Sequence, residues 1–153
     1  GIELKPLKYG GTGRNSAQLT YENKDYEYEV GTQNMPGITG LLAGAEFIEQ
    51  TGLAAIMEKE ARLMEMLYCG LEQIEGVRNF QGLKASDAAY ILESGYGIIV
   101  RSGLHCSPLI HKAMGTEEGG TVRVSVSWFT EEKDIKEFLG AAKEIAASVA
   151  RNI

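Results

Sequence analysis

The sequence predicts an α+β fold, in which helices cover a small mixed or antiparallel sheet. Two observations lead to this class. Long segments carry apolar residues at helical spacing, whereas residues 97–101 and 121–126 are short apolar or alternating runs typical of strands. An extended lead-in and two helices are followed by strand, helix, strand, helix, strand and helix. Packing of helices on one face of a sheet buries the apolar side of both.

Composition narrows the class of protein. A chain of 153 residues can bury a sizeable core, and 44% hydrophobic with 24% charged residues is ordinary for a globular domain. The net charge of −6 argues against nucleic acid as a partner. No apolar run has the length of a membrane span, and no signal peptide is recognisable. Two cysteines in unlike contexts predict no disulfide framework, so we expect a cytoplasmic protein.

The first third of the chain carries two candidate anion sites. Residues 10–13, Gly-Gly-Thr-Gly, are a glycine-rich loop whose backbone N–H groups suit an anion, although a plain surface loop is the simpler interpretation. A helix is predicted to follow Asn34, a good N-cap, with Pro36 in its first turn, and to end near residue 50. Thr32, Gln33 and the free N–H groups of this first turn form the second candidate, and the alternative is a plain capped helix.

A long amphipathic helix is predicted over residues 53–75, with Gly76 as its C-terminal cap. Cys69 lies off its apolar stripe and is interpreted as structural. Short segments then predict a strand start at 77–80 and a helix at 87–93. The final helix is expected to begin after Thr130, which is a suitable cap.

The segment from Arg101 to Pro108 concentrates reactive residues on a loop between a strand and a short helix at 109–114. Cys106 is nucleophilic only as a thiolate, which neighbouring cations such as Arg101 favour. The alternative is that Cys106 is a small buried hydrophobe. His105, Cys106 and His111 lack a fourth partner, so no metal site is predicted. In the strand over 121–126, Arg123 is predicted to face away from its valine neighbours.

Four motifs in the same order resemble one family of enzymes. Arg-Ser-Gly-Leu-His-Cys at residues 101–106 is similar to the active-cysteine loop of cysteine desulfurases and selenocysteine lyases. These are pyridoxal-phosphate (PLP) enzymes of the class V aminotransferase type. Residues 31–37 resemble the family's phosphate-binding segment, residues 10–13 its glycine pair, and residues 121–129 its arginine strand.

The resemblance implies a role for each matched residue. Cys106 would take sulfur from the substrate as a persulfide, releasing alanine. Arg123 would hold the substrate α-carboxylate, with Arg101 and His105 on the substrate side. The residues that the resemblance places at the PLP phosphate are Gly10, Gly11, Gly31 and Thr32.

The resemblance also implies that this chain is only the C-terminal part of such an enzyme. Residues 1–36 would end the large PLP-binding domain, and residues 37–153 would form the small domain. No lysine has the setting of the PLP-binding lysine, so the chain alone is expected to be inactive. The stretch between residues 80 and 86 is shorter than in the family, which has a loop and another strand at this place. The expected partners are L-cysteine or L-selenocysteine, a sulfur-acceptor protein, and a second subunit in a homodimer.

Two alternatives remain at this point. The chain is also compatible with a class V aminotransferase or another lyase of the same fold, for which Cys106 would be dispensable. A third interpretation is a non-catalytic domain that dimerises or relays sulfur through Cys106.

Overall fold

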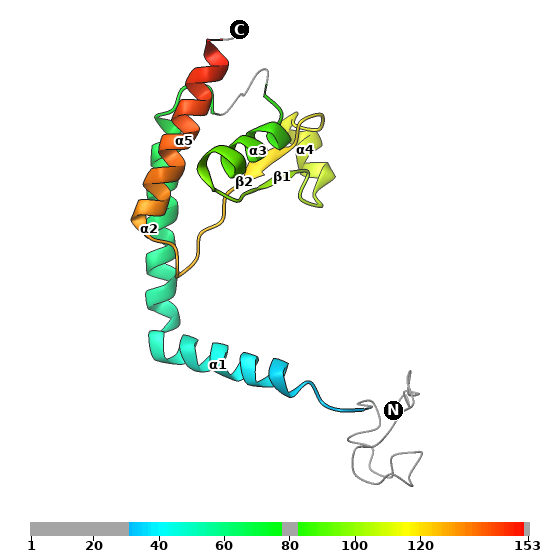
Figure 1. The fold of residues 1–153 in the computed structure, drawn as a ribbon, viewed down its shortest axis with the longest axis vertical. Coiled ribbons are helices and arrows are strands. Elements are labelled where there is room, and N and C mark those ends of the chain that lie inside the picture. The colour runs from blue at the N-terminus through cyan, green and yellow to red at the C-terminus, as the bar shows by residue number, and fades with distance from the viewer. Residues whose placement is uncertain (1–30, 78–82, 152–153) are drawn as a thin grey trace. The chain divides into compact units, whose positions relative to one another are not determined.

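The computed structural model describes residues 31–77 and 83–151. The described part contains five helices and one two-stranded sheet, which confirms the α+β prediction (Figure 1). The elements in order are α1 (Met35–Thr51), α2 (Leu53–Glu72), α3 (Ala85–Tyr96), β1 (Arg101–Gly103), α4 (Pro108–Met114), β2 (Thr121–Arg123) and α5 (Glu132–Ala150). The chain divides into two compact units, Gly1–Thr51 and Gly52–Ile153.

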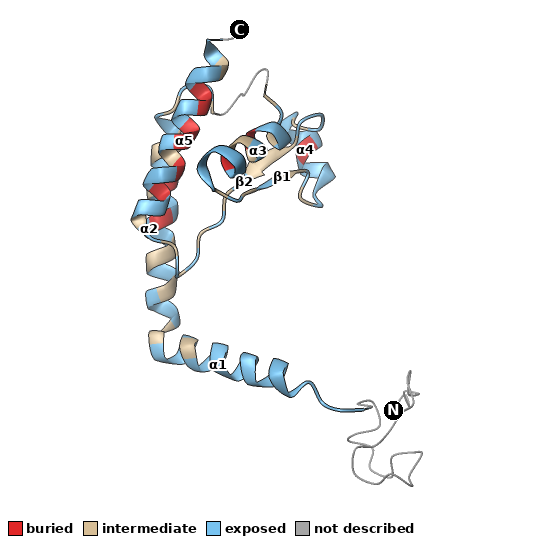
Figure 2. Cartoon of the chain, viewed as in Figure 1, coloured by how far each residue is buried: buried red, intermediate tan, exposed pale blue. Residues whose placement is uncertain are grey.

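The first unit contains helix α1, whose start is as predicted. The Asn34 side chain accepts a hydrogen bond from the Gly37 N–H at 3.1 Å, so Asn34 caps the helix. Gly52, with a φ of 85°, separates α1 from α2, because this left-handed conformation ends a helix and suits glycine. None of the residues of α1 is buried (Figure 2).

The core of the second unit lies between α2 and α5, which run side by side (Figure 1), and α3. Leu63 of α2 is 1% exposed, and α5 contributes Ile135, Phe138 and Ile145. Gly70 permits the close approach of α2 and α5, because a Cβ at that position would lie 2.3 Å from a Leu139 methyl carbon. The apolar stripes at helical spacing therefore predicted the correct buried faces.

The sheet is antiparallel, and its register pairs Arg101 with Arg123, Ser102 with Val122, and Gly103 with Thr121. The predicted strand bounds were wrong. The first strand starts at Arg101, where the prediction ended it, and the second stops at Arg123 although its alternation continues to Val126. The reason is that a strand extends only as far as a neighbour pairs with it, and β1 and β2 meet over three residues.

Several helix boundaries also differ from the prediction. Helix α2 ends at Glu72, one turn early, and Gly76 lies with a φ of 87° in the turns beyond it. Helix α3 is longer than predicted, because Gly97 in the left-handed conformation ends it only after Tyr96. Helix α5 is capped by Glu131 instead of Thr130, through a capping box with Asp134.

Cys69 is exposed on α2, which agrees with its predicted position off the apolar stripe. The glycine-rich loop at 10–13, the extended segments predicted within residues 1–30 and most of the strand start at 77–80 lie outside the described residues. Across the described ranges, none of the helices has the length and apolar character to cross a membrane.

Candidate active-cysteine site

The cysteine segment forms a tight turn between β1 and α4. The Ser107 N–H donates a hydrogen bond to the Leu104 carbonyl at 2.9 Å, which closes a four-residue turn. His105 and Cys106 occupy its centre with φ values of 50° and 60°. A closed turn with two positive φ values is of the type I′ kind, which glycine, asparagine and aspartate dominate. No other non-glycine residue in the described ranges has a positive φ.

The turn presents the Cys106 side chain to solvent, since Cys106 is exposed. It therefore contradicts the alternative in which the thiol is a buried hydrophobe. Backbone strain of this kind, of order 1–3 kcal/mol per residue, persists where the surrounding structure holds it and concentrates at functional sites. The sequence carried no signal of the turn type, because histidine and cysteine are unusual in it.

Relief of this strain predicts a measurable gain in stability. Replacing Cys106 with glycine is expected to raise the free energy of unfolding of the chain by about 1 kcal/mol, because glycine adopts positive φ without a steric penalty. Ser107→Gly is the matched control: Ser107 has a φ of −131°, so glycine there only adds freedom to the unfolded chain and lowers stability. Urea unfolding measures both, and a less stable Cys106→Gly variant would contradict the proposed strain.

His105 anchors the turn to β2. Its Nε2 lies 3.0 Å from the Thr121 carbonyl oxygen, and because a carbonyl only accepts, Nε2 carries the proton and donates. Its Nδ1 is buried without a hydrogen-bond partner in the described structure. The neighbouring imidazole of His111 is 3% exposed, and its Nδ1 lies 2.8 Å from the Thr116 hydroxyl. The centroids of the two histidine rings are 6.1 Å apart, so His111 of α4 lies close to the ring that anchors the turn.

Two arginines lie opposite each other on the solvent face of the sheet. The register pairs Arg101 of β1 directly with Arg123 of β2, and both are exposed. Neighbours in this arrangement have Cβ atoms about 5 Å apart, and like charges there repel each other. Within the described ranges neither guanidinium forms an ion pair. Arg123 faces away from Val122 and Val124, as predicted, and the pairing with Arg101 is a feature that the sequence did not reveal.

The segment before α1 offers less to an anion than predicted. The Met35 N–H donates to the Gln33 carbonyl, the Gly37 N–H to the Asn34 side chain and the Ile38 N–H to the Asn34 carbonyl. Pro36 has no N–H, so the first turn of α1 has no free amide. The exposed Thr32 hydroxyl and the left-handed Gly31, with a φ of 83°, remain as candidates, whereas Gly10 and Gly11 lie outside the described residues.

A metal centre finds no support in the described residues, where no three His, Cys, Asp or Glu side chains are placed to hold an ion. The site therefore consists of an exposed thiol on the strained turn that follows β1, together with two arginines that pair at the other end of β1 and β2 and have no ion-pair partner in the described ranges. A soft nucleophile and a pair of planar cations carried by one strand pair and its turn suit a small substrate that carries a carboxylate.

Comparison with known proteins identifies the class. The model of the aminotransferase class-V family matches residues 2–138, and the chain belongs to this family. It is 30% identical to a probable cysteine desulfurase of Methanothermobacter thermautotrophicus over 94% of the chain and 40% of the relative. A probable cysteine desulfurase of Pyrococcus abyssi is also 30% identical, over 94% of the chain and 39% of the relative. The chain thus spans about two fifths of the length of these relatives.

Proposed function

We propose that the chain is the C-terminal part of a PLP-dependent cysteine desulfurase, which converts L-cysteine to L-alanine and an enzyme persulfide. The observation that carries this proposal is the register that pairs Arg101 with Arg123, on the same strand pair from which the turn with the exposed Cys106 extends. The names of the relatives support the same reaction. Residues 1–36 would belong to the large PLP-binding domain and residues 37–153 to the small domain.

In this proposal the two arginines bind and orient the substrate. A planar guanidinium donates two parallel hydrogen bonds to a carboxylate, which fixes the direction of the substrate as well as its position. The second arginine adds positive charge, and binding of the anion relieves the repulsion between the two. Arg123 would hold the α-carboxylate and Arg101 would complete the substrate side, whereas His105 would hold the turn in place through its bond to the Thr121 carbonyl.

Cys106 would act as the sulfur acceptor. Its thiolate attacks the sulfur of L-cysteine, a sulfur–sulfur bond forms, and the carbon–sulfur bond of the substrate breaks. The Cβ of the substrate gains a proton, so the products are alanine and the Cys106 persulfide, and no external oxidant is needed. Exposure of the thiol on the turn would let a sulfur-acceptor protein reach the persulfide.

Bound PLP would supply the electron sink for this reaction. Thr32 and Gly31 fit its phosphate only in part. The Thr32 hydroxyl is exposed and could donate to a phosphate oxygen, whereas the amides in the first turn of α1 already donate within the protein. The lysine that holds PLP would lie outside this chain, in the part of the enzyme that the chain does not span. The complete protein would then be this chain together with that lysine-bearing part, expected to be a cytoplasmic homodimer.

Replacement of Cys106 by serine in the complete protein tests the proposal. Formation of alanine from L-cysteine is expected to fall at least about 100-fold, because the hydroxyl of serine cannot accept sulfur. The matched control is Cys69→Ser, which removes the other exposed cysteine and should leave turnover unchanged. Intact-mass analysis after substrate addition should find the extra sulfur in the protein with Cys106 and not in Cys106→Ser.

The same experiment separates the alternatives. A class V aminotransferase or another lyase would keep its turnover in Cys106→Ser. A sulfur-relay domain would accept sulfur from a persulfide donor at Cys106, but borohydride reduction with PLP would leave no cofactor adduct on a lysine of the complete protein. L-selenocysteine as an alternative substrate distinguishes a lyase for selenium from a desulfurase.

A further inference from the structure

One polar side chain is buried close to the cysteine turn. His111 of α4 is 3% exposed, and no other polar or charged side chain in the described ranges is buried. A buried polar ring destabilises the fold unless its nitrogen atoms find partners. Its Nδ1 lies 2.8 Å from the Thr116 hydroxyl, which supplies such a partner. The sulfur transfer at Cys106 makes no direct use of His111 or Thr116, so the reason for burying this pair lies elsewhere.

The end of α4 brings the Thr116 hydroxyl to the His111 ring. Gly115, in the left-handed conformation with a φ of 67°, ends the helix. The Thr116 N–H then donates to the His111 carbonyl at 2.9 Å, and the Gly115 N–H donates to the Lys112 carbonyl at 3.4 Å. These two bonds form a Schellman motif. Thr116 is therefore joined to His111 through both its main chain and its side chain, which fixes the hydroxyl relative to the ring.

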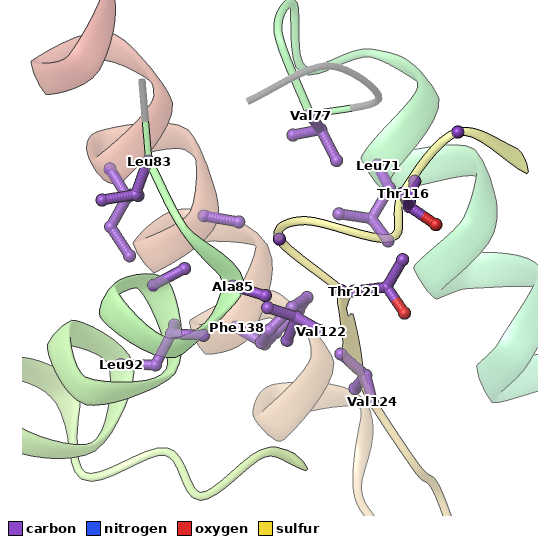
Figure 3. A pocket seen from close by; sticks show the side chains of 16 residues that line it. Leu71, Val77, Leu83, Ala85, Leu92, Thr116, Thr121, Val122, Val124 and Phe138 are labelled. Atoms are coloured by element: carbon purple, nitrogen blue, oxygen red, sulfur yellow. The ribbon is translucent and has the colours of Figure 1, made fainter. Parts of the chain in front are cut away.

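Thr116 also leads to the carbonyl group that holds the cysteine turn. Its own carbonyl accepts a hydrogen bond from the Gly120 N–H at 2.9 Å. Gly120 precedes Thr121, whose carbonyl oxygen lies 3.0 Å from the His105 Nε2. Thr116 and Thr121 line the same apolar pocket, whose walls include core side chains (Figure 3), so both ends of this short segment lie against the core. The position of the acceptor for His105 thus depends on Thr116.

The His111 ring approaches the turn from the side of α4. The ring centroids of His105 and His111 are 6.1 Å apart and their planes are inclined by 44°, which is within the range of aromatic packing. The His111 N–H also donates to the carbonyl of Ser107, the residue that closes the turn, at 3.4 Å. The His105 Nδ1 has no hydrogen-bond partner in the described structure. The orientation of the His105 ring therefore depends on one hydrogen bond and on packing, to which the His111 ring contributes.

We propose that His111 and Thr116 are positioning residues for Cys106. Thr116 orients the His111 ring, this ring supports the His105 ring, and His105 keeps the turn in its strained form. Such support is needed because the positive φ values at His105 and Cys106 persist only where the surrounding structure imposes them. The contacts form a closed circuit through His105, Thr121, Gly120, Thr116 and His111.

Sulfur transfer gives this positioning a consequence, and that part of the inference rests on the proposed function. Attack on the substrate sulfur requires the thiolate in line with the reacting atoms, and a small displacement slows such a reaction strongly. Neither His111 nor Thr116 would touch the substrate. Loss of their support should therefore lower kcat and leave the binding of L-cysteine by Arg123 intact.

Replacement of Thr116 by valine in the 153-residue chain tests the positioning itself. The NMR cross peak between the amide proton and the α proton of Cys106 reports the sign of φ, because these two protons are closest at positive φ. Thr116→Val removes the hydroxyl and nearly keeps the shape, and the cross peak should weaken about threefold as the turn relaxes to negative φ. Thr116→Ser retains the hydroxyl and should preserve the cross peak. Cysteine-selective labelling gives two signals, and Cys69 in α2 is the internal reference that unfolding would also affect.

A second threonine provides the matched control. The Thr130 hydroxyl accepts a hydrogen bond from the Ser127 N–H at 3.0 Å, and Thr130 is half-buried like Thr116. Thr130→Val therefore loses a comparable bond and should leave the Cys106 cross peak unchanged. An unchanged cross peak in Thr116→Val, or an equal loss in Thr130→Val, overturns the proposal.

Turnover of the complete protein tests the consequence for catalysis. In Thr116→Val, kcat for alanine formation is expected to fall about tenfold with an unchanged KM for L-cysteine, and Thr116→Ser should recover it. A raised KM with an unchanged kcat would place Thr116 in substrate binding and contradict a positioning role. The cross peak is measured without substrate or PLP, so it tests the positioning even where Cys106→Ser keeps its turnover and the proposed function fails.

Discussion

Replacing Arg123 with glutamine in the complete protein is expected to lower kcat/KM for L-cysteine about 100-fold or more. Removal of one partner of a desolvated carboxylate–guanidinium pair typically destabilises the complex by about 2–5 kcal/mol, which corresponds to this range of rates. Arg123→Lys keeps the charge but loses the planar fork, so it should recover only part of the loss. Steady-state kinetics with L-cysteine measures kcat/KM for the unaltered protein, Arg123→Gln and Arg123→Lys.

The register of the sheet supplies the controls for this prediction. Arg101→Gln removes the cross-strand neighbour and should also impair L-cysteine turnover, whereas Lys136→Gln removes an exposed cation of α5 and should not. A kcat/KM in Arg123→Gln equal to that of the unaltered protein would exclude Arg123 from the binding of the substrate carboxylate.

Replacing Gly120 with alanine is expected to lower the free energy of unfolding of the chain by about 2–4 kcal/mol, because strain at a left-handed residue adds to a steric clash. Gly120 has a φ of 66°, and a Cβ there would lie 2.6 Å from the backbone of Gly103. The contact is with backbone atoms, so the two strands must separate where β1 pairs with Thr121. Urea unfolding of the unaltered chain and of Gly120→Ala measures this loss of free energy of unfolding.

The neighbouring glycine provides a matched control for this substitution. A Cβ at Gly119 would meet no heavy atom within 4 Å, and the φ of Gly119 is not positive, so Gly119→Ala should change stability little. Equal stability of the two variants would show that the close approach of β1 and β2 does not limit side-chain size at Gly120. Because Gly120 leads into β2, its replacement should also disturb the bond from His105 to the Thr121 carbonyl.

Local sequence signals were sufficient to locate the helices, although not to fix every boundary. The cap at Asn34, the break at Gly52 and the apolar stripes of α2 and α5 depend on residues only a few positions apart. The motifs that resemble the family are also short local patterns, and their order along the chain was enough to assign the family. The match of the family model over residues 2–138 confirms this assignment. The exposed face of Arg123 followed from the strand period alone.

Tertiary structure decided the features that join distant parts of the chain. The lengths of β1 and β2 follow from where they meet, and the alternation that continues to Val126 could not reveal that its partner strand begins only at Arg101. The juxtaposition of Arg101 with Arg123 depends on that register, and a shift by one residue would place them on opposite faces. The turn that exposes Cys106 is held by the bond from His105 to Thr121, sixteen residues away. Such contacts arise only when the chain folds, because three-dimensional packing decides which strands pair, and no local sequence pattern records it.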